Sequence, residues 1–187
     1  MSVSWKPSRE QIAAALNAPV EDVIASNLKV LFCGINPGLY SGAVGHHFAR
    51  PGNRFWPTLH LSGFTGRRLS AFEERELLAS SLGVTNFVNR ATATADGVER
   101  RELVAGRKAL EAKALEYSPS FVAILGLGAY RTAFGAAKAA VGPQSEKLGP
   151  ARLWLLPNPS GLNAHYQLDA LTSAFASLRV AAGPEPI

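Results

Sequence analysis

The residues best suited to chemistry in this chain lie in short segments rich in glycine and polar side chains. These segments span 34–38 (Gly-Ile-Asn-Pro-Gly), 46–56, 89–97 and 157–163. The first has neither the Gly-Lys-Ser/Thr ending of a Walker loop nor the G-x-G-x-x-G pattern of dinucleotide-binding folds. Its central residue, Asn36, carries an amide, which orients a water or a ligand but has no protonatable lone pair with which to act as a base. The alternative is that Asn36 and Pro37 only form a turn.

The elements around these segments indicate an α/β fold. β-rich segments at 29–33, 83–88, 121–125 and 152–156 alternate with helical patterns at 72–80, 103–118, 130–141 and 168–178. Three of the four strands are almost continuously apolar, as strands buried on both faces require. We therefore predict three α/β/α layers around a central, mainly parallel four-stranded sheet. Ligands of such sheets bind beyond the carboxyl ends of the strands, where three of the polar segments would converge.

Length and composition indicate one globular domain. The chain has 187 residues, of which 47% are hydrophobic, and this is enough to build a core without covalent cross-links. We expect a single domain over 28–187 and a helical extension packed on it at 1–27. In that extension Ser8 caps a short helix, Pro19 ends it, and residues 20–26 form one or two further turns.

The single cysteine and the charge restrict the chemistry further. Cys33 alone cannot form an internal disulfide, a multi-cysteine zinc site or a four-thiolate iron–sulfur cluster. It fits a reducing cytoplasm, where we expect the protein to act. The first residues show no apolar signal core, and no segment approaches the roughly 18 uninterrupted apolar residues of a membrane helix. The net charge of +5 suits an anionic partner but does not identify one.

Two motifs, 34–38 and 158–162 (Asn-Pro-Ser-Gly-Leu), resemble those of the mismatch-specific uracil-DNA glycosylases. This Mug and thymine-DNA glycosylase family is a branch of the uracil-DNA glycosylase superfamily. The segments 45–56 and 85–92 look like the thymine-DNA glycosylase versions of the intervening motifs, whereas 158–162 has the bacterial form. The resemblance runs from about residue 20 to about residue 180, and residues 1–18 carry no recognisable motif.

The resemblance implies a monomeric, monofunctional glycosylase that excises uracil, and by extension thymine or ethenocytosine, from G·U-type mismatches in double-stranded DNA. Such an enzyme pulls the nucleotide out of the stack and hydrolyses the glycosidic bond through an oxocarbenium-like sugar. Asn36 would position the attacking water. No lysine occurs in the site segments, so no Schiff base is expected. The resemblance implies neither a cofactor nor a metal, and the four histidines lack the spacing of metal ligands.

A carboxylate near Asn36 would compensate for the weak chemistry of an amide. Of the three aspartates, Asp22 and Asp169 lie in helical patterns, whereas Asp96 follows the second strand at the edge of the sheet that carries the site. We hypothesise that Asp96 supplements or replaces Asn36 in activating water or stabilising the cationic sugar. The alternative is a turn residue, because Asp-Gly is a strong turn signal.

The remaining roles implied by the resemblance concern the base and the DNA. Phe48 would stack on the extruded base and Asn86 would read its edge, because an amide offers both a donor and an acceptor. Leu162 would be the wedge that fills the vacated stack, although it could instead pack on the last helix. The other expected contacts are base-pocket contacts by Ile35, Gly38 and His47, opposite-strand contacts by Gly161 and Asn163, and phosphate contacts by Asn158 and Ser160.

Two features leave alternatives open. Many bacterial relatives carry an arginine two residues after the wedge, where this chain has Ala164 followed by His165, and this change favours looser selectivity for the opposite base. Arg50, Arg54, Arg67, Arg68 and Arg90 are further candidate phosphate contacts, or simply a solvated face. The main alternative function is a catalytically weak or inert module that binds mismatched or abasic DNA. A nucleotide-binding α/β enzyme would also have this fold, but the sequence has no phosphate-binding loop.

Overall fold

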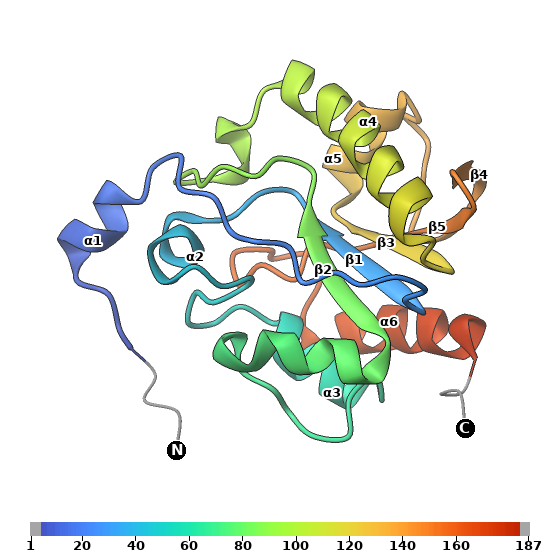
Figure 1. Ribbon diagram of the computed structural model, residues 1–187, viewed down its shortest axis with the longest axis horizontal. Helices are drawn as coiled ribbons and strands as arrows, with labels where there is room; N and C mark the ends of the chain where they lie inside the picture. Colours follow the sequence, from blue (N-terminus) through green and yellow to red (C-terminus); the bar gives the residue numbers. More distant parts are fainter. Residues whose placement is uncertain (1–4, 184–187) are drawn as a thin grey trace.

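A five-stranded sheet forms the centre of the molecule (Figure 1). The computed structural model describes residues 5–183. The strand order is β2 (Leu82–Asn86), β1 (Val30–Gly34), β3 (Phe121–Leu125), β5 (Ala151–Leu156) and β4 (Gly142–Leu148). The first four run parallel, and only β4 pairs antiparallel, with β5. The α/β/α architecture with a mainly parallel sheet is therefore confirmed.

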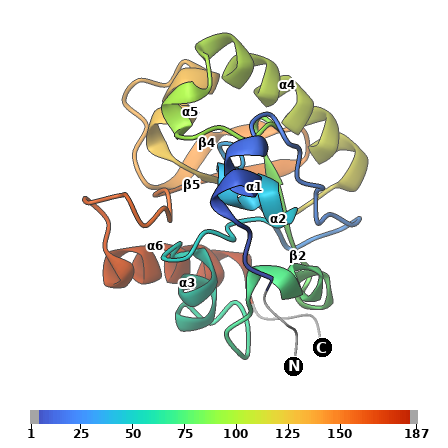
Figure 2. The same cartoon turned by 90° about the vertical axis from the view of Figure 1, so that its left-hand side faces the viewer.

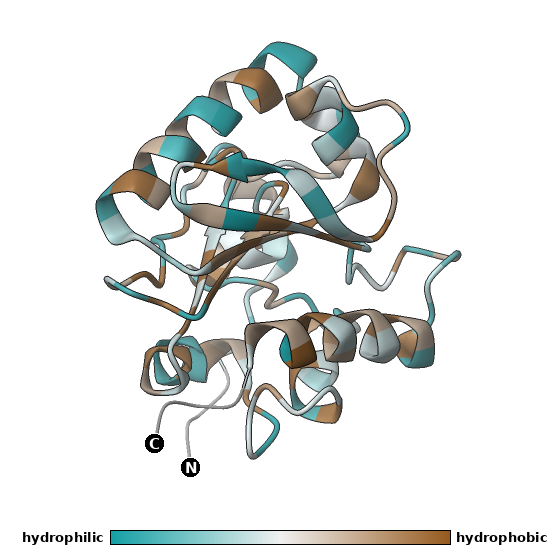
Figure 3. Ribbon diagram, turned by 90° about the vertical axis from the view of Figure 1, so that its right-hand side faces the viewer, coloured by the Kyte–Doolittle hydropathy of each residue, from teal (hydrophilic) through white to brown (hydrophobic). Residues whose placement is uncertain are grey.

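The fifth strand, β4, corrects the expected number of four. The sequence pattern at 130–141 predicts one helix, but helix α5 (Leu127–Phe134) ends at Gly135, which adopts the left-handed conformation. The chain then returns as β4, whose residues are mostly exposed or half-buried. An edge strand of this kind has no continuous apolar run, and for that reason it is missed in a sequence. Figure 3 faces this edge and shows the β4–β5 hairpin between the helices of the two outer layers.

Helices cover both faces of the sheet, and successive residues of each strand pack on opposite faces. In β1, Val30 and Phe32 join one apolar cluster, whereas Leu31 and Cys33 join the other. The first cluster packs against α3 (Phe55–Leu61), α6 (Leu168–Ala182) and the 3₁₀ helix η1 (Ala71–Ser80). The second packs under α4 (Arg100–Tyr117) and α5. These are the lower and upper layers of Figure 1.

The N-terminal segment lies against the loops rather than apart from them. Ser8 caps helix α1 (Arg9–Ala14) through a capping box, as expected. Residues 20–26, however, do not form the expected helical turns: they run extended, and Val23 forms an antiparallel bridge with Val84 of β2. The extended conformation buries the Val23 side chain and lets its backbone pair with β2, and this explains the difference. Residues 1–4 of the expected extension lie outside the described residues.

The carboxyl ends of the parallel strands meet at one edge, which carries helices α1 and α2 (Leu39–Val44) and faces the viewer in Figure 2. Gly34 at the end of β1 pairs in register with Asn86 at the end of β2, and Leu125 of β3 pairs with Leu156 of β5. The polar segments after these strands are thereby placed side by side. Over residues 5–183, no helix has the length and apolar character needed to span a bilayer.

Candidate active site

A cavity of about 140 Å³ opens at this edge of the sheet. It is built from the loops that follow β1, β2 and β5. Nine of the residues singled out in the sequence line it: Ile35, Asn36, Gly38, His47, Phe48, Asn86, Asn158, Ser160 and Leu162. The structure thus brings together side chains that lie up to 127 positions apart in the chain. Asp96, Gly161 and Asn163 are not among the lining residues.

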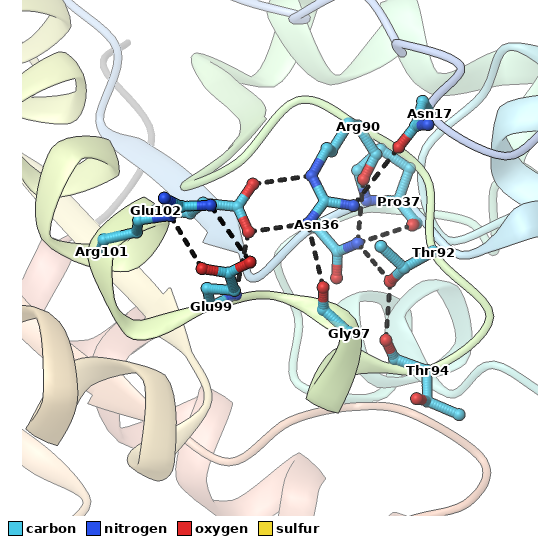
Figure 4. Close-up of polar contacts among 10 residues, drawn as sticks. All are labelled: Asn17, Asn36, Pro37, Arg90, Thr92, Thr94, Gly97, Glu99, Arg101 and Glu102. Carbon is cyan, nitrogen blue, oxygen red and sulfur yellow. Dashed lines mark hydrogen bonds and ion pairs between the residues drawn. The ribbon is translucent and has the colours of Figure 1, made fainter.

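The side-chain amide of Asn36 is held in one orientation by three acceptors (Figure 4). Its Nδ2 lies 2.9 Å from the carbonyl oxygen of Arg90, 3.1 Å from that of Pro37 and 2.7 Å from the Thr92 hydroxyl. The carbonyl oxygens can only accept, so the nitrogen must face them. The Thr92 hydroxyl also accepts, because its own proton goes to the Thr94 carbonyl at 2.6 Å. The Asn36 Oδ1 is therefore left to accept a hydrogen bond from a ligand or a water.

An ion pair behind the site supports this arrangement. The Arg90 guanidinium binds both carboxylate oxygens of Glu102, at 2.6 and 2.7 Å, and the Gly97 carbonyl at 2.9 Å (Figure 4). It also reaches Asn17 Oδ1 at 3.4 Å. The hydrogen bonds from Arg90 lower the pKa of Glu102 to about 2. Arg90 thus ties its loop to α4, and this loop supplies two of the acceptors that hold Asn36.

This positioning role was missed in the sequence, where Arg90 appears only as one of five candidate phosphate contacts. The side chain is committed to Glu102 instead. Arg67 is likewise paired, with Glu73 and Glu76. The spacing of 12 residues between Arg90 and Glu102 crosses a loop and a helix start, so no helical or strand periodicity could have revealed the pair.

Asn86 and His47 form the buried wall of the cavity. Asn86 Nδ2 lies 3.3 Å from His47 Nδ1, and His47 Nε2 lies 2.9 Å from the Glu21 carbonyl oxygen. Burial is the main cause that lowers the pKa of His47 below its ordinary value of 6.5, while the carboxylates of Glu74 and Asp22 oppose the shift. His47 is therefore a neutral imidazole at pH 7.

The loop that carries His47 and Phe48 is anchored to η1. The buried carboxylate of Glu74 accepts a hydrogen bond from the His47 backbone N–H at 2.8 Å and contacts His46 Nδ1 at 2.8 Å. Phe48 adopts a positive φ of 52°, which a phenylalanine takes only where its surroundings impose it. Its ring stacks on Phe55 with a centroid distance of 4.1 Å and also lines the cavity. The ring is thus fixed as a flat apolar wall.

The loop after β5 presents an apolar tip beside the cavity. Leu162 is 70% exposed and also lines the cavity, so an apolar side chain stands at its rim. The Arg54 guanidinium fastens this loop by donating to the carbonyl oxygens of Gly161, Asn163 and Tyr166 at 3.1, 3.0 and 2.6 Å. Gly161 is required here, because a Cβ would lie 2.5 Å from the Gly52 carbonyl oxygen. Arg54, another candidate phosphate contact, is thus committed to holding the leucine loop.

The polar side chains of this loop also bind one another. Asn158 Oδ1 accepts from the Ser160 backbone N–H at 2.9 Å, and Ser160 Oγ accepts from the Leu162 N–H at 3.3 Å. Asn163 donates to the Asn158 carbonyl at 3.0 Å and accepts from the His165 N–H at 3.1 Å. These bonds build a rigid turn under Leu162, and the expected phosphate contacts of Asn158 and Ser160 stay a prediction.

Asp96 lies outside the cavity that contains Asn36. It is exposed in the short 3₁₀ helix η2 (Ala95–Gly97) and lines a neighbouring cavity of about 620 Å³. Ile35, Ala95 and Asn158 line both cavities and separate them. The structure therefore does not place Asp96 in the cavity of Asn36, and its hypothesised catalytic role stays a prediction. Among residues 5–183, no group of three or more His, Cys, Asp or Glu side chains is arranged to hold a metal ion.

A mainly parallel α/β sheet thus carries an amide-lined cavity at the carboxyl ends of its strands, where ligands of such sheets bind, beside a loop that ends in an exposed leucine. Residues 21–179 match the family model of the uracil DNA glycosylase superfamily, and the chain belongs to this superfamily. Membership implies a DNA glycosylase, that is, a hydrolase of N-glycosidic bonds that acts on DNA in repair.

The fold comparison agrees with this membership. The chain is similar to the solution NMR structure of a candidate uracil DNA glycosylase from Methanosarcina acetivorans, with a TM-score of 0.54 and 16% identity over 88% of this chain and 99% of that chain. At this identity the likeness concerns the fold.

Proposed function

We propose that the protein is a monofunctional glycosylase of the mismatch-specific Mug and thymine-DNA glycosylase type. It extrudes uracil from G·U mismatches in double-stranded DNA and hydrolyses its glycosidic bond, leaving an abasic site. The observation that carries the proposal is the fixed amide of Asn36, which lines the cavity and whose nitrogen is held by three acceptors, so that its oxygen is left to bind a water.

The proposed reaction begins with the extruded nucleotide in the cavity. Its base lies against the Phe48 ring and its edge faces the Asn86 amide. Asn36 Oδ1 accepts a hydrogen bond from a water and holds it opposite the leaving base. As the glycosidic bond breaks, its electron pair leaves with the uracil base, which departs as an anion and takes a proton from solvent. The sugar takes on oxocarbenium character and the water adds to its anomeric carbon. The water loses its proton to solvent, because an amide cannot take it.

Water is the proposed nucleophile because no lysine lines this cavity in the described part of the chain. A lysine amine would be needed for a Schiff base with the sugar. Leu162 is the proposed wedge: its exposed side chain enters the vacated stack and offsets part of the cost of unstacking. The net charge of +5 supports non-specific attraction to phosphates.

A single-turnover assay on a duplex with one central uracil opposite guanine tests the proposal. Alkaline cleavage of the product strand reveals abasic sites, and the matched cytosine duplex is the control. We expect abasic product only from the uracil duplex. Binding of the G·U duplex with no abasic product would instead establish the alternative of an inert mismatch-binding module. Duplexes carrying thymine or ethenocytosine, and single-stranded uracil DNA, then define the breadth of substrates.

A further inference from the structure

The buried imidazole of His47 lies between two partners, one of which can only accept a hydrogen bond. Nε2 faces the backbone carbonyl oxygen of Glu21 at 2.9 Å, and Nδ1 faces Nδ2 of Asn86 at 3.3 Å. The exposed fractions are 2% for His47 and 7% for Asn86, so bulk water offers neither group a ready substitute. Buried polar groups of this kind are satisfied by specific partners.

The Glu21 carbonyl oxygen decides the tautomer of His47. Because this oxygen cannot donate, Nε2 must carry the proton, and in the neutral ring Nδ1 is then an acceptor. An acceptor at Nδ1 requires Asn86 to turn its nitrogen toward the histidine. The Asn86 oxygen is thereby directed over Gly34, where a Cβ would lie only 2.4 Å from it. Gly34 leaves the space that this amide orientation needs.

We propose that His47 is a positioning residue that fixes the Asn86 amide and so makes the cavity select uracil over cytosine. This inference rests on the proposed uracil excision. Uracil presents an N3–H donor beside its O4 acceptor, whereas cytosine presents an N3 acceptor beside its N4 amino donor. An amide that offers its oxygen to N3 and its remaining N–H to the exocyclic group matches uracil only. If the amide turned over, the match would be to cytosine.

The same arrangement makes selection sensitive to acid. Protonation of His47 places a second N–H at Nδ1, which then requires the Asn86 oxygen and turns the amide over. The charged or titratable groups that act on His47 are the carboxylates of Glu74 and Asp22, which favour protonation, and His46, which opposes it. Uracil excision therefore falls as the pH drops through the lowered pKa of His47, and is fully present above it.

The test uses duplexes that carry 5-fluorouracil or 5-fluorocytosine opposite guanine. The two bases differ only at the hydrogen-bonding edge, and fluorine makes both better leaving groups. In His47→Leu the amide is free to turn, and we expect the ratio of the two excision rates to fall by roughly 10- to 100-fold, because the lost preference equals one hydrogen bond and one repulsive contact. His60→Leu is the matched control: this histidine lies on α3, contacts the Thr65 carbonyl and does not line the cavity, so the ratio stays at the wild-type value.

A double-mutant cycle separates positioning from folding. If His47 acts through Asn86, His47→Leu changes the ratio in the wild type and leaves it unchanged in Asn86→Ala. The same change in both backgrounds, or a wild-type ratio in His47→Leu, overturns the inference. The pH profile adds a test without substitution: acid loss of 5-fluorouracil excision is expected in the wild type near the pKa of His47, and a flat profile there contradicts the role.

A last measurement does not depend on activity. Nitrogen-resolved NMR of the imidazole at pH 7 is expected to show the neutral Nε2–H tautomer of His47, with the Asn86 side-chain resonances shifting when the ring is protonated. An Nδ1–H tautomer overturns the inference whatever the enzyme does. An Nε2–H tautomer in a protein that releases no uracil would refute the proposed function while leaving the amide orientation in place.

Discussion

The two sides of the cavity are built on opposite principles. On the β1–β2 side, polar side chains are held by partners within the protein: Asn36 by three acceptors, and the buried Asn86 by His47. On the β5 side, the polar side chains hydrogen-bond within their own loop, and an apolar side chain, Leu162, is left 70% exposed at its tip. Preorganised dipoles suit the reacting atoms, since they need no rearrangement during the reaction. An exposed apolar tip suits a partner that buries it.

The comparison predicts that a substitution on the first side slows the chemical step without weakening DNA binding. Asn36→Ala removes the oxygen that holds the water, and we expect the single-turnover excision rate to fall by roughly 10²- to 10³-fold, the usual effect of losing one preorganised polar group. The affinity for a G·U duplex, measured by fluorescence anisotropy, should stay within about twofold of the wild type. A comparable loss of affinity would place Asn36 in binding and refute its catalytic role.

Leu162→Ala should instead weaken the complex in which the nucleotide is extruded from the duplex. Loss of most of a leucine side chain from a buried contact weakens it by about 1.5–3 kcal/mol, which corresponds to roughly 10- to 100-fold. We expect that loss in excision from the paired duplex. Uracil in single-stranded DNA has no stack to fill, so its excision, where it is accepted, should change little. Equal losses on both substrates would show that Leu162 is not a wedge.

How much of this comparison a sequence contains differs between the two sides. The motif segments 34–38 and 158–162 place Asn36 and Leu162 in loops, and strands with continuous apolar runs predict the parallel sheet. The edge strand β4 is missed, because its residues are half-exposed and carry no apolar pattern. The clamps are missed for a different reason: Arg54 and Arg90 contact groups far along the chain or across a loop, and a single arginine looks the same whether it faces phosphate or a carbonyl.

The Arg90–Glu102 clamp allows a sharper test of the first side. Glu102→Gln keeps the size of the side chain but removes the charge, so the loop that holds Asn36 should loosen. We expect the excision rate to fall by roughly 3- to 10-fold with unchanged DNA affinity, and Glu76→Gln, an exposed partner of Arg67, serves as the control. An effect on affinity alone would instead make Arg90 a DNA contact.

The pH dependence of this clamp follows from the depressed pKa of Glu102, about 2 against an ordinary 4.5. A carboxylate whose pKa is lowered in the folded state stabilises that state above its ordinary pKa, and the contribution disappears as the pH falls toward about 2. No loss of activity from this pair is therefore expected between pH 5 and pH 8. An acid limb in that interval that survives in Glu102→Gln must come from another group, for which His47 is the candidate.

A substitution of Asp96 has the smallest expected effect, and it tests whether a group outside the cavity of Asn36 contributes to catalysis. The Asp96 carboxylate is exposed on the neighbouring cavity, beyond Ala95 and Ile35, so any help to the cationic sugar must act through space or through a shift of η2 on DNA binding. If Asp96 supplements Asn36, Asp96→Ala should lower the single-turnover rate by a few-fold, because a solvent-exposed charge acts in a high dielectric.

Asp96→Asn, which keeps the turn-forming side chain but not the charge, distinguishes electrostatics from loop geometry: an equal loss in both variants supports the charge. A wild-type rate in Asp96→Ala ends the hypothesis and leaves Asn36 as the group that positions the water, whereas a loss larger than that of Asn36→Ala would move the catalytic centre to the second cavity.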